Sequence, residues 1–420
     1  MRLVTASLST VIVVLALAAC GGSSSSGKTA TINVWAGTQP GGSFQDAAKQ
    51  CSASSNGAYT IKFNALANNP DAQRQSLVRR LAAKDSSIDI VGMDVVWTAE
   101  FAEAGWIKPF PTAVADRVRT GMLQGPVQTA TYKGRLYGAP GNSNTQLLWY
   151  RKDLVSRPAD TWDGLIKQAS ALPKAGRFEI AGAAAENTTV WFNALVASAG
   201  GKILSGPRTP NFGPPVQEAV RVMGELADSK AADPSLAQQK EDQNRLAFQS
   251  GQAAFMVNWP FVYPSIKTAA EGGDKTAKQV LDNLGWMPYP RVNANEPAKG
   301  PIGGFNWGVS SYGKHKAQAF AAAACLASAR SQKIYLDKDG LAPTISAIYD
   351  DKKTQGIYPF YGLIRKGLET GAPRPSTPAY SDVSLAIYST LSPTSNAAKP
   401  NALDELRKNI KTALSPKGVL

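Results

Sequence analysis

The pattern of hydrophobic positions changes its period near residue 94. Ile88–Met93 is an apolar run interrupted only by Asp89, which is typical of a strand buried on both faces of a parallel sheet. The next apolar residues recur at helical spacing: Trp97, Phe101 and Ala104. Asp94 therefore stands at the carboxyl end of a predicted strand, the edge where open α/β sheets bind ligands. The alternative is that Asp94 only caps the following helix.

The chain before this point shows the same alternation of short strands and helices. Strands are predicted at Thr31–Trp35 and Tyr59–Phe63, and helices at Phe44–Ala53 and Ala72–Ala83. Strand–helix–strand–helix–strand at these spacings predicts a doubly wound α/β lobe.

The remaining chain predicts the rest of this lobe, including the hairpin at Lys133–Gly134 and the helix Lys316–Ala329, and a second lobe of the same class. Its predicted helices and strands are a hairpin at Lys133–Gly134, strands at Gln146–Tyr150, Phe178–Ala181 and Ala253–Asn258, and helices entered at Thr161 and spanning Thr189–Ala199, Pro215–Leu226, Asp242–Ser250, Lys316–Ala329 and Asn401–Leu414. Glycine-bearing segments at Gly141–Asn144, Gly300–Gly304 and Gly340–Thr344 are interpreted as three crossings between lobes. The predicted fold is a two-lobed α/β protein with a ligand cleft between the lobes.

The first residues predict export and an anchor. Residues 1–19 combine Arg2, an apolar core and a small-residue ending, which together indicate a signal peptide. Leu17–Cys20 resembles the bacterial lipobox, in which the cysteine is acylated, so Cys20 is predicted to carry lipid. A glycine- and serine-rich stretch follows, and residues 20–28 are interpreted as a lipidated tether. The expected location is the extracytoplasmic face of the cell membrane; the alternative is an ordinary secretory signal.

About 400 residues remain after cleavage, more than one hydrophobic core usually contains. We assign residues 29–142 and 303–342 to one lobe and residues 143–302 and 343–420 to the other. The formal net charge is +14, yet lysine and arginine are dispersed, so no nucleic-acid partner is expected. Cys51 and Cys325 form an even pair on predicted helices, which favours a disulfide in an exported protein. Two buried thiols are the alternative.

The residues available for catalysis are few. The sequence has a single histidine, His315, and it has no CxxC pair and no G-x-S-x-G motif. A metal site or a nucleophilic triad would therefore lack the residues that it needs, and no cofactor is expected. Asp94 and Glu241 remain a candidate glycosidase pair. Several of the nine tryptophans instead stand beside polar residues or glycine at predicted strand ends or on helices: Trp97, Trp191, Trp259 and Trp307. Flat aromatic rings cover the apolar faces of sugars, although core packing is the alternative for each one.

Five strings in this sequence resemble the extracellular solute-binding proteins of ABC sugar importers, and most closely the trehalose-binding lipoproteins among them. They are MDVVWTAEFAEAGW, NTQLLWYRKDLV, WFNALVASAGG, RLAFQSGQAAFMVNWPF and IGGFNWGV. The resemblance covers most of the mature chain. It implies a two-lobed periplasmic-binding-protein fold that closes around a sugar and delivers it to a membrane permease.

The resemblance also implies a ligand set. The residues that match the family's sugar ligands are Asp94, Asn144, Glu241, Trp259, Gly304 and Arg374, and Cys51 and Cys325 match two of its cysteines. The sequence departs from the family in the first turn, where GTQPGG leaves Gln39 as the nearest polar candidate, and at Phe305 and Trp307, where aliphatic residues are expected. Gln39 and Phe305 are added to the predicted site.

These observations predict a non-enzymatic, monomeric lipoprotein that captures trehalose or a trehalose-like α-glucoside for an ABC permease. A receptor for another sugar such as maltose is the first alternative. An exported glycosidase, or a structural lipoprotein whose tryptophans only pack the core, are the others.

Overall fold

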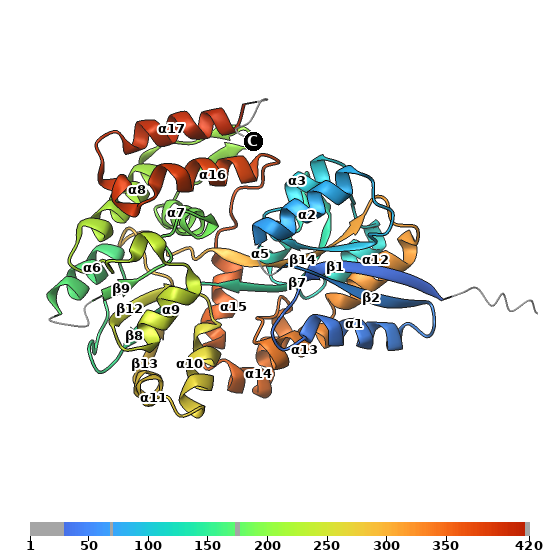
Figure 1. The fold of residues 1–420 in the computed structure, drawn as a ribbon, viewed down its shortest axis with the longest axis horizontal. Helices are drawn as coiled ribbons and strands as arrows, with labels where there is room; N and C mark the ends of the chain where they lie inside the picture. The colour runs from blue at the N-terminus through green and yellow to red at the C-terminus, as the bar shows by residue number, and fades with distance from the viewer. Residues whose placement is uncertain (1–28, 68–69, 173–176, 416–420) are drawn as a thin grey trace, which may run out of the picture.

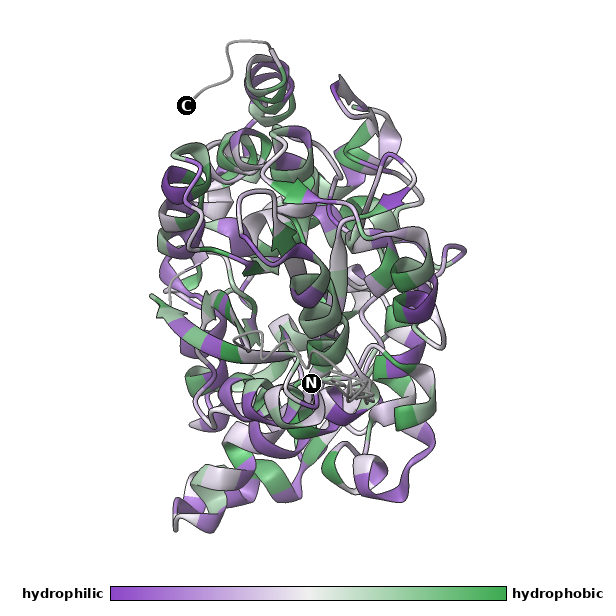
Figure 2. Ribbon diagram, turned by 90° about the vertical axis from the view of Figure 1, so that its right-hand side faces the viewer, coloured by the Kyte–Doolittle hydropathy of each residue, from purple (hydrophilic) through white to green (hydrophobic). Residues whose placement is uncertain are grey.

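The computed structural model describes residues 29–67, 70–172 and 177–415 and consists of two α/β lobes side by side (Figure 1). The predicted signal peptide and tether, including Cys20, lie outside the described residues. Within those residues, no helix is long and apolar enough to cross a membrane. The outer helices carry hydrophilic and hydrophobic residues in alternation, as expected for helices that cover a core on one face (Figure 2).

The first lobe is built on a mixed sheet with the strand order β2-β1-β3-β14-β4, in which β7 also pairs with β14. Its strands are β1 (Ala30–Gly37), β2 (Tyr59–Leu66), β3 (Ile90–Asp94), β4 (Ile107–Lys108), β7 (Gly138–Thr145) and β14 (Ile302–Ser310). β1, β2 and β3 are parallel, whereas β14 runs antiparallel to its neighbours. The helices α1 (Ser43–Ser54), α2 (Pro70–Ala82), α3 (Thr98–Glu103), α4 (Thr112–Arg119), α5 (Gln124–Thr129), α12 (Lys316–Leu326) and α13 (Ala329–Asp339) and a hairpin of β5 (Thr131–Tyr132) and β6 (Arg135–Leu136) complete this part of the chain.

The second lobe is built on a four-stranded sheet with the order β13-β8-β12-β9. Its strands are β8 (Leu147–Arg151), β9 (Arg177–Glu179), β12 (Ala253–Asn258) and β13 (Leu284–Met287), with a separate ribbon of β10 (Leu204–Gly206) and β11 (Thr209–Pro210). The helices that follow these strands or close the chain are α6 (Trp162–Ala171), α7 (Glu186–Ser198), α8 (Pro214–Asp228), α9 (Glu241–Gln249), α10 (Val262–Glu271), α11 (Lys275–Asp282), α14 (Lys352–Ile357), α15 (Tyr361–Thr370), α16 (Tyr380–Leu391) and α17 (Ala402–Ala413). The two-lobed α/β prediction is confirmed; the lobe limits assigned by residue number stay a prediction.

Three segments pass between the lobes side by side. β7 pairs with β14 along most of its length, and Ser143 ties both to the third segment: its amide donates to Ala342 O at 3.0 Å and its hydroxyl to Gly303 O at 2.7 Å. The buried amide of Gln332 holds the third segment, accepting from Thr344 N at 2.7 Å. The polar segment predicted at Gly141–Asn144 is therefore part of strand β7, whose pairing with β14 shifts register at Gly141.

Two helix boundaries differ from the prediction. The helix expected at Lys316–Ala329 is interrupted: α12 ends at Leu326, and α13 begins after Ser328, whose hydroxyl accepts from Ser331 N as an N-cap. The helix expected from Thr189 begins three residues earlier, at Glu186. The negative charge of Glu186 in the first turn is favourable there, because the N-terminus is the positive end of the helix dipole.

Cys51 on α1 and Cys325 on α12 form a disulfide, with their Cα atoms 5.9 Å apart. Both cysteines lie on helices, as predicted, and the alternative of two free thiols is wrong for this structure. The bond ties the start of the folded chain to a segment 274 residues later.

A buried carboxyl group in the second lobe makes stability depend on pH. Glu179 on β9 is fully buried, and burial, followed by the negative charge of Asp233, raises its pKa from 4.5 to about 8. The native state therefore keeps a proton that the unfolded chain releases near pH 4.5. The stabilisation is complete below pH 4.5 and is lost as pH rises through about 8.

We expect Glu179→Gln to flatten this dependence, because glutamine does not titrate. The free energy of unfolding of the wild type should fall by up to about 1.4 kcal/mol per pH unit over that window, measured by urea denaturation at several pH values. Glu405→Gln, the same change at an exposed position of α17, should keep the wild-type slope. Equal slopes for Glu179→Gln and the wild type would show that Glu179 is ionised in the native protein.

Candidate functional site

A cleft of about 640 Å³ lies between the lobes, within the range of small-molecule sites. Its first-lobe wall comes from the ends of β3, β7 and β14, and its second-lobe wall from the starts of α7 and α9 and from the segment that leads into α16. All eight residues predicted to bind ligand line it: Gln39, Asp94, Asn144, Glu241, Trp259, Gly304, Phe305 and Arg374.

Strand register places the first-lobe residues next to one another. Phe305 on β14 lies opposite Asp94 on β3, and Gly303 lies opposite Asn144 on β7. Gly304 has φ +128°, and a Cβ atom there would lie 2.3 Å from the carbonyl oxygen of Asn142. Only glycine fits this position, so Gly304 shapes the cleft floor by its lack of a side chain.

Asp94 is not the cap of the following helix. α3 starts after Trp97, whereas the Asp94 carboxylate accepts from Val96 N at 3.2 Å and from Arg374 Nη2 at 3.3 Å. The carboxylate is partly exposed to the cleft. The capping alternative is therefore wrong, and Asp94 links the end of β3 to a residue of the second lobe.

Trp259 is held by the end of β12 and by the close approach of β14. Its amide donates to the Asn258 side chain at 2.7 Å, and a Cβ at Gly303 would lie 3.1 Å from the edge of its ring. The missing side chain at Gly303 therefore lets the half-buried indole lie against the strand.

Glu241 is the first residue of α9 and is held by the same asparagine. Asn258, which is almost fully buried, donates from Nδ2 to the carbonyl oxygen of Glu241 at 2.8 Å. Burial raises the pKa of Glu241, and the charge of Glu186 adds to the rise, while its own backbone amide, Lys240 and Arg374 lower it. Asn258 is predicted from the sequence only as the last residue of a strand, and the structure shows that its side chain contacts the backbone of both Glu241 and Trp259.

Arg374 carries the best-buried charge of the cleft, with 4% of its side chain exposed. It forms ion pairs with Glu186 through Nη1 and with Asp94 through Nη2. Burial by itself lowers the pKa of Arg374, but Tyr380, Asp94 and Glu186 raise it overall, so the guanidinium stays charged.

Gln39 lies on the turn between β1 and α1. Gly42 N donates to its carbonyl at 3.0 Å, and Asp339 of α13 accepts from the amides of Gly41 and Ser43. The GTQPGG turn is thus fixed to the last residue of α13, just before the third interlobe segment. The Gln39 side chain is half-buried at the cleft.

The tryptophans divide between core and cleft. Trp191 and Trp307 are fully buried, so the core-packing alternative holds for both. Trp97 is 5% exposed and stacks on Phe101, yet its edge reaches the cleft. Of the four tryptophans singled out in the sequence, Trp259 is the only one whose side chain is half-buried, and the other three are buried.

Sequence reasoning missed a group of polar and aromatic residues on the cleft wall. They are Asp71, Arg74, Asn142, Glu186, Asn187, Lys240, Tyr380, Ser384 and Tyr388. Most lie at helix starts or on the inner face of α16, where polar residues are common for local reasons. Glu186 is the one that the sequence could have indicated most directly, because it is an acidic residue in the first turn of a helix, α7.

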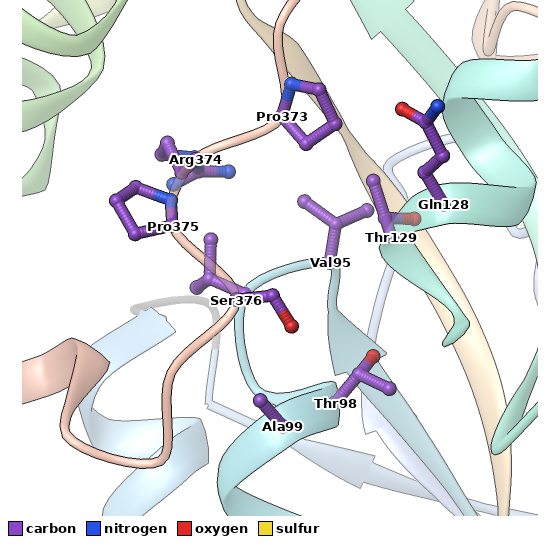
Figure 3. A pocket seen from close by; sticks show the side chains of 10 residues that line it. Val95, Thr98, Ala99, Gln128, Thr129, Pro373, Arg374, Pro375 and Ser376 are labelled. Carbon is purple, nitrogen blue, oxygen red and sulfur yellow. The ribbon is translucent and has the colours of Figure 1, made fainter. Parts of the chain in front are cut away.

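A second, much smaller cavity of about 30 Å³ lies beside the cleft (Figure 3). Its walls are the segment 373–376 on one side and the turn after β3 with α5 on the other. Its size suits a water molecule and excludes a sugar ring. Arg374 lines both spaces, which places its guanidinium at the contact between the lobes.

Two α/β lobes, three connecting segments and a cleft lined by polar and aromatic side chains define a binding protein of the periplasmic type. Residues 35–333 match the family of bacterial extracellular solute-binding proteins. The chain therefore belongs to this family: it is an exported binding protein, not an enzyme, and the glycosidase alternative is not supported.

Individual relatives agree with this assignment. A "Probable ABC transporter-binding protein" of Deinococcus radiodurans is 27% identical over 357 residues, which is 79% of this chain and 82% of the relative. The mannitol-binding protein of Pseudomonas aeruginosa is 25% identical over 64% of this chain and 63% of its own length. The maltose-bound MalE3 of T. maritima has the same fold, with a TM-score of 0.76, 23% identity and coverage of 92% of this chain and 99% of that one.

Proposed function

We propose that this protein is the substrate-binding lipoprotein of an ABC sugar importer and that it captures trehalose or a trehalose-like α-glucoside. The observation that supports the proposal most is that eight residues spread from position 39 to position 374 line one cleft. Residues so far apart in the chain share a small volume only when the fold brings them there. A receptor for maltose is the second candidate, since a structural relative binds that sugar.

The chemistry of the cleft suits a polyhydroxylated ligand. Asp94 and Glu241 accept hydrogen bonds from hydroxyl groups, and the Asn144 amide both donates and accepts. The Trp259 ring covers an apolar sugar face, and Arg374 donates from the opposite wall. Arg374 and Asn142 line this cleft, and the Arg374 Nε and Asn142 Oδ1 atoms are buried without a hydrogen-bond partner in the described part of the chain.

Calorimetric titration with trehalose, maltose and mannitol, followed by a test for sugar hydrolysis, checks the function. We expect one disaccharide to bind and to be recovered without hydrolysis. Binding of mannitol alone would assign the protein to polyols, as for its Pseudomonas relative. Release of glucose would contradict a pure binding role.

The anchor is a separate prediction, based on Leu17–Cys20 and the serine-rich stretch behind it. In a bacterial host that processes lipoproteins, the wild type should enter the detergent phase on Triton X-114 partition, and Cys20→Ala should move it to the aqueous phase. A Cys20→Ala variant that stays in the detergent phase would contradict lipidation.

The protein is expected to act as a monomer beside its permease.

A further inference from the structure

The charge of the cleft differs in sign from the charge of the whole chain. The formal net charge is +14, yet among the described residues the cleft is lined by four acidic and three basic side chains. The acidic ones are Asp71, Asp94, Glu186 and Glu241, and the basic ones are Arg74, Lys240 and Arg374. The excess positive charge therefore lies elsewhere on the surface.

The basic side chains of the cleft are matched by nearby acids. Arg74 is held by Glu100 in a two-pronged ion pair, with contacts of 2.9 and 2.6 Å. Lys240 is exposed, and its charge acts on the adjacent carboxylate of Glu241. Arg374, the buried one, pairs with both Glu186 and Asp94.

Glu186 is the centre of the second-lobe wall. One of its oxygens accepts from Arg374 Nη1 and from the hydroxyl of Tyr380, and the other accepts from the hydroxyl of Ser384. The Arg374 guanidinium also lies 5.9 Å from the centre of the Tyr380 ring. Glu186 thus contacts three cleft residues at once and compensates Arg374, the buried cation among the described residues of the cleft.

We propose that Glu186 is a positioning residue that sets the charge selectivity of the cleft. By pairing with Arg374 it holds the guanidinium as a hydrogen-bond donor for hydroxyl groups and cancels the charge that would attract an anion. The cleft then accepts neutral sugars and rejects sugar phosphates and uronic acids, since an added negative charge would face Asp94, Glu186 and Glu241. This inference rests on the proposed function of sugar binding.

The experiment compares neutral and anionic probes on one variant. The wild type and Glu186→Gln are each titrated with three neutral probes, trehalose, maltose and mannitol. They are also titrated separately with three anionic probes, trehalose 6-phosphate, glucose 6-phosphate and glucuronate. The variant should bind its neutral sugar more weakly and an anionic probe more tightly. The ratio of neutral-sugar affinity to anionic-probe affinity should fall by about tenfold or more, because one charge contact at about 4 Å near a protein surface is worth more than the roughly 1.4 kcal/mol that equals tenfold. Opposite changes for the two probe classes cannot arise from a general loss of structure.

Two further variants complete the test. Glu186→Gln combined with Arg374→Gln should lose the gained affinity for anions, because the positive charge that Glu186 had compensated is gone. Glu405→Gln, which removes the same charge from α17, should leave both affinities unchanged. Melting curves of the ligand-free variants verify that each is folded.

The outcomes separate this inference from the function on which it rests. A wild type that binds neutral and anionic sugars equally, or a Glu186→Gln variant with an unchanged ratio, would overturn the role of Glu186 while sugar binding stands. A wild type that binds only anionic probes would overturn the charge selectivity and the proposed ligand together. Binding of none of the six probes would contradict sugar capture itself.

Discussion

Trp259→Ala is expected to weaken sugar binding roughly 30- to 150-fold, the equivalent of about 2–3 kcal/mol for an apolar contact of roughly 100 Å². The indole is half-buried at the end of β12 and lies against the bare backbone of Gly303. Its ring is therefore positioned before ligand arrives, so little ordering cost opposes the contact. Calorimetric titration with the sugar that the wild type binds measures the loss.

The same variant should melt close to the wild type without ligand, and this separates a binding role from a packing role. Trp162→Ala is the matched control, because Trp162 is fully buried in the second-lobe core. Removing that ring should destabilise the protein by about 3–5 kcal/mol and leave the affinity of the folded fraction intact. If Trp259→Ala melted early and kept its affinity, Trp259 would be a packing residue.

Replacing both Cys51 and Cys325 by alanine is expected to lower the free energy of unfolding by about 2–5 kcal/mol. The bond closes a loop of 274 residues, so its loss releases a large part of the unfolded chain from constraint. Urea denaturation of the variant and of the oxidised and reduced wild type measures the effect. Reduced wild type and the double variant should unfold at similar urea concentrations.

Sugar affinity should be unchanged in the double cysteine variant, because neither cysteine lines the cleft. The loss is then one of stability alone. Modification of two thiols by iodoacetamide in the folded, untreated protein would show that the disulfide is absent in solution.

Several residues of the cleft could be singled out from the sequence because they stand at the ends of regular elements. Asp94 follows an apolar run, Trp259 follows a strand and Glu241 opens a helix, and each of these positions can be read within about ten residues. The resemblance to a known family added Asn144, Gly304 and Arg374, which carry no local signal of that kind. Glu186 escaped because the start of α7 was placed three residues too late.

The order and type of the elements were determined by the sequence itself, because hydrophobic periodicity, caps and glycine turns act over short distances along the chain. Which tryptophans enter the core, and which one faces the cleft, was decided by the tertiary structure, since every one of them has the same local preference for burial. The chain of charges from Glu186 through Arg374 to Asp94 joins residues 188 and 280 positions apart. Such a contact depends on the path of the whole chain, because each partner alone is an ordinary polar residue and only the packing of two lobes makes them neighbours.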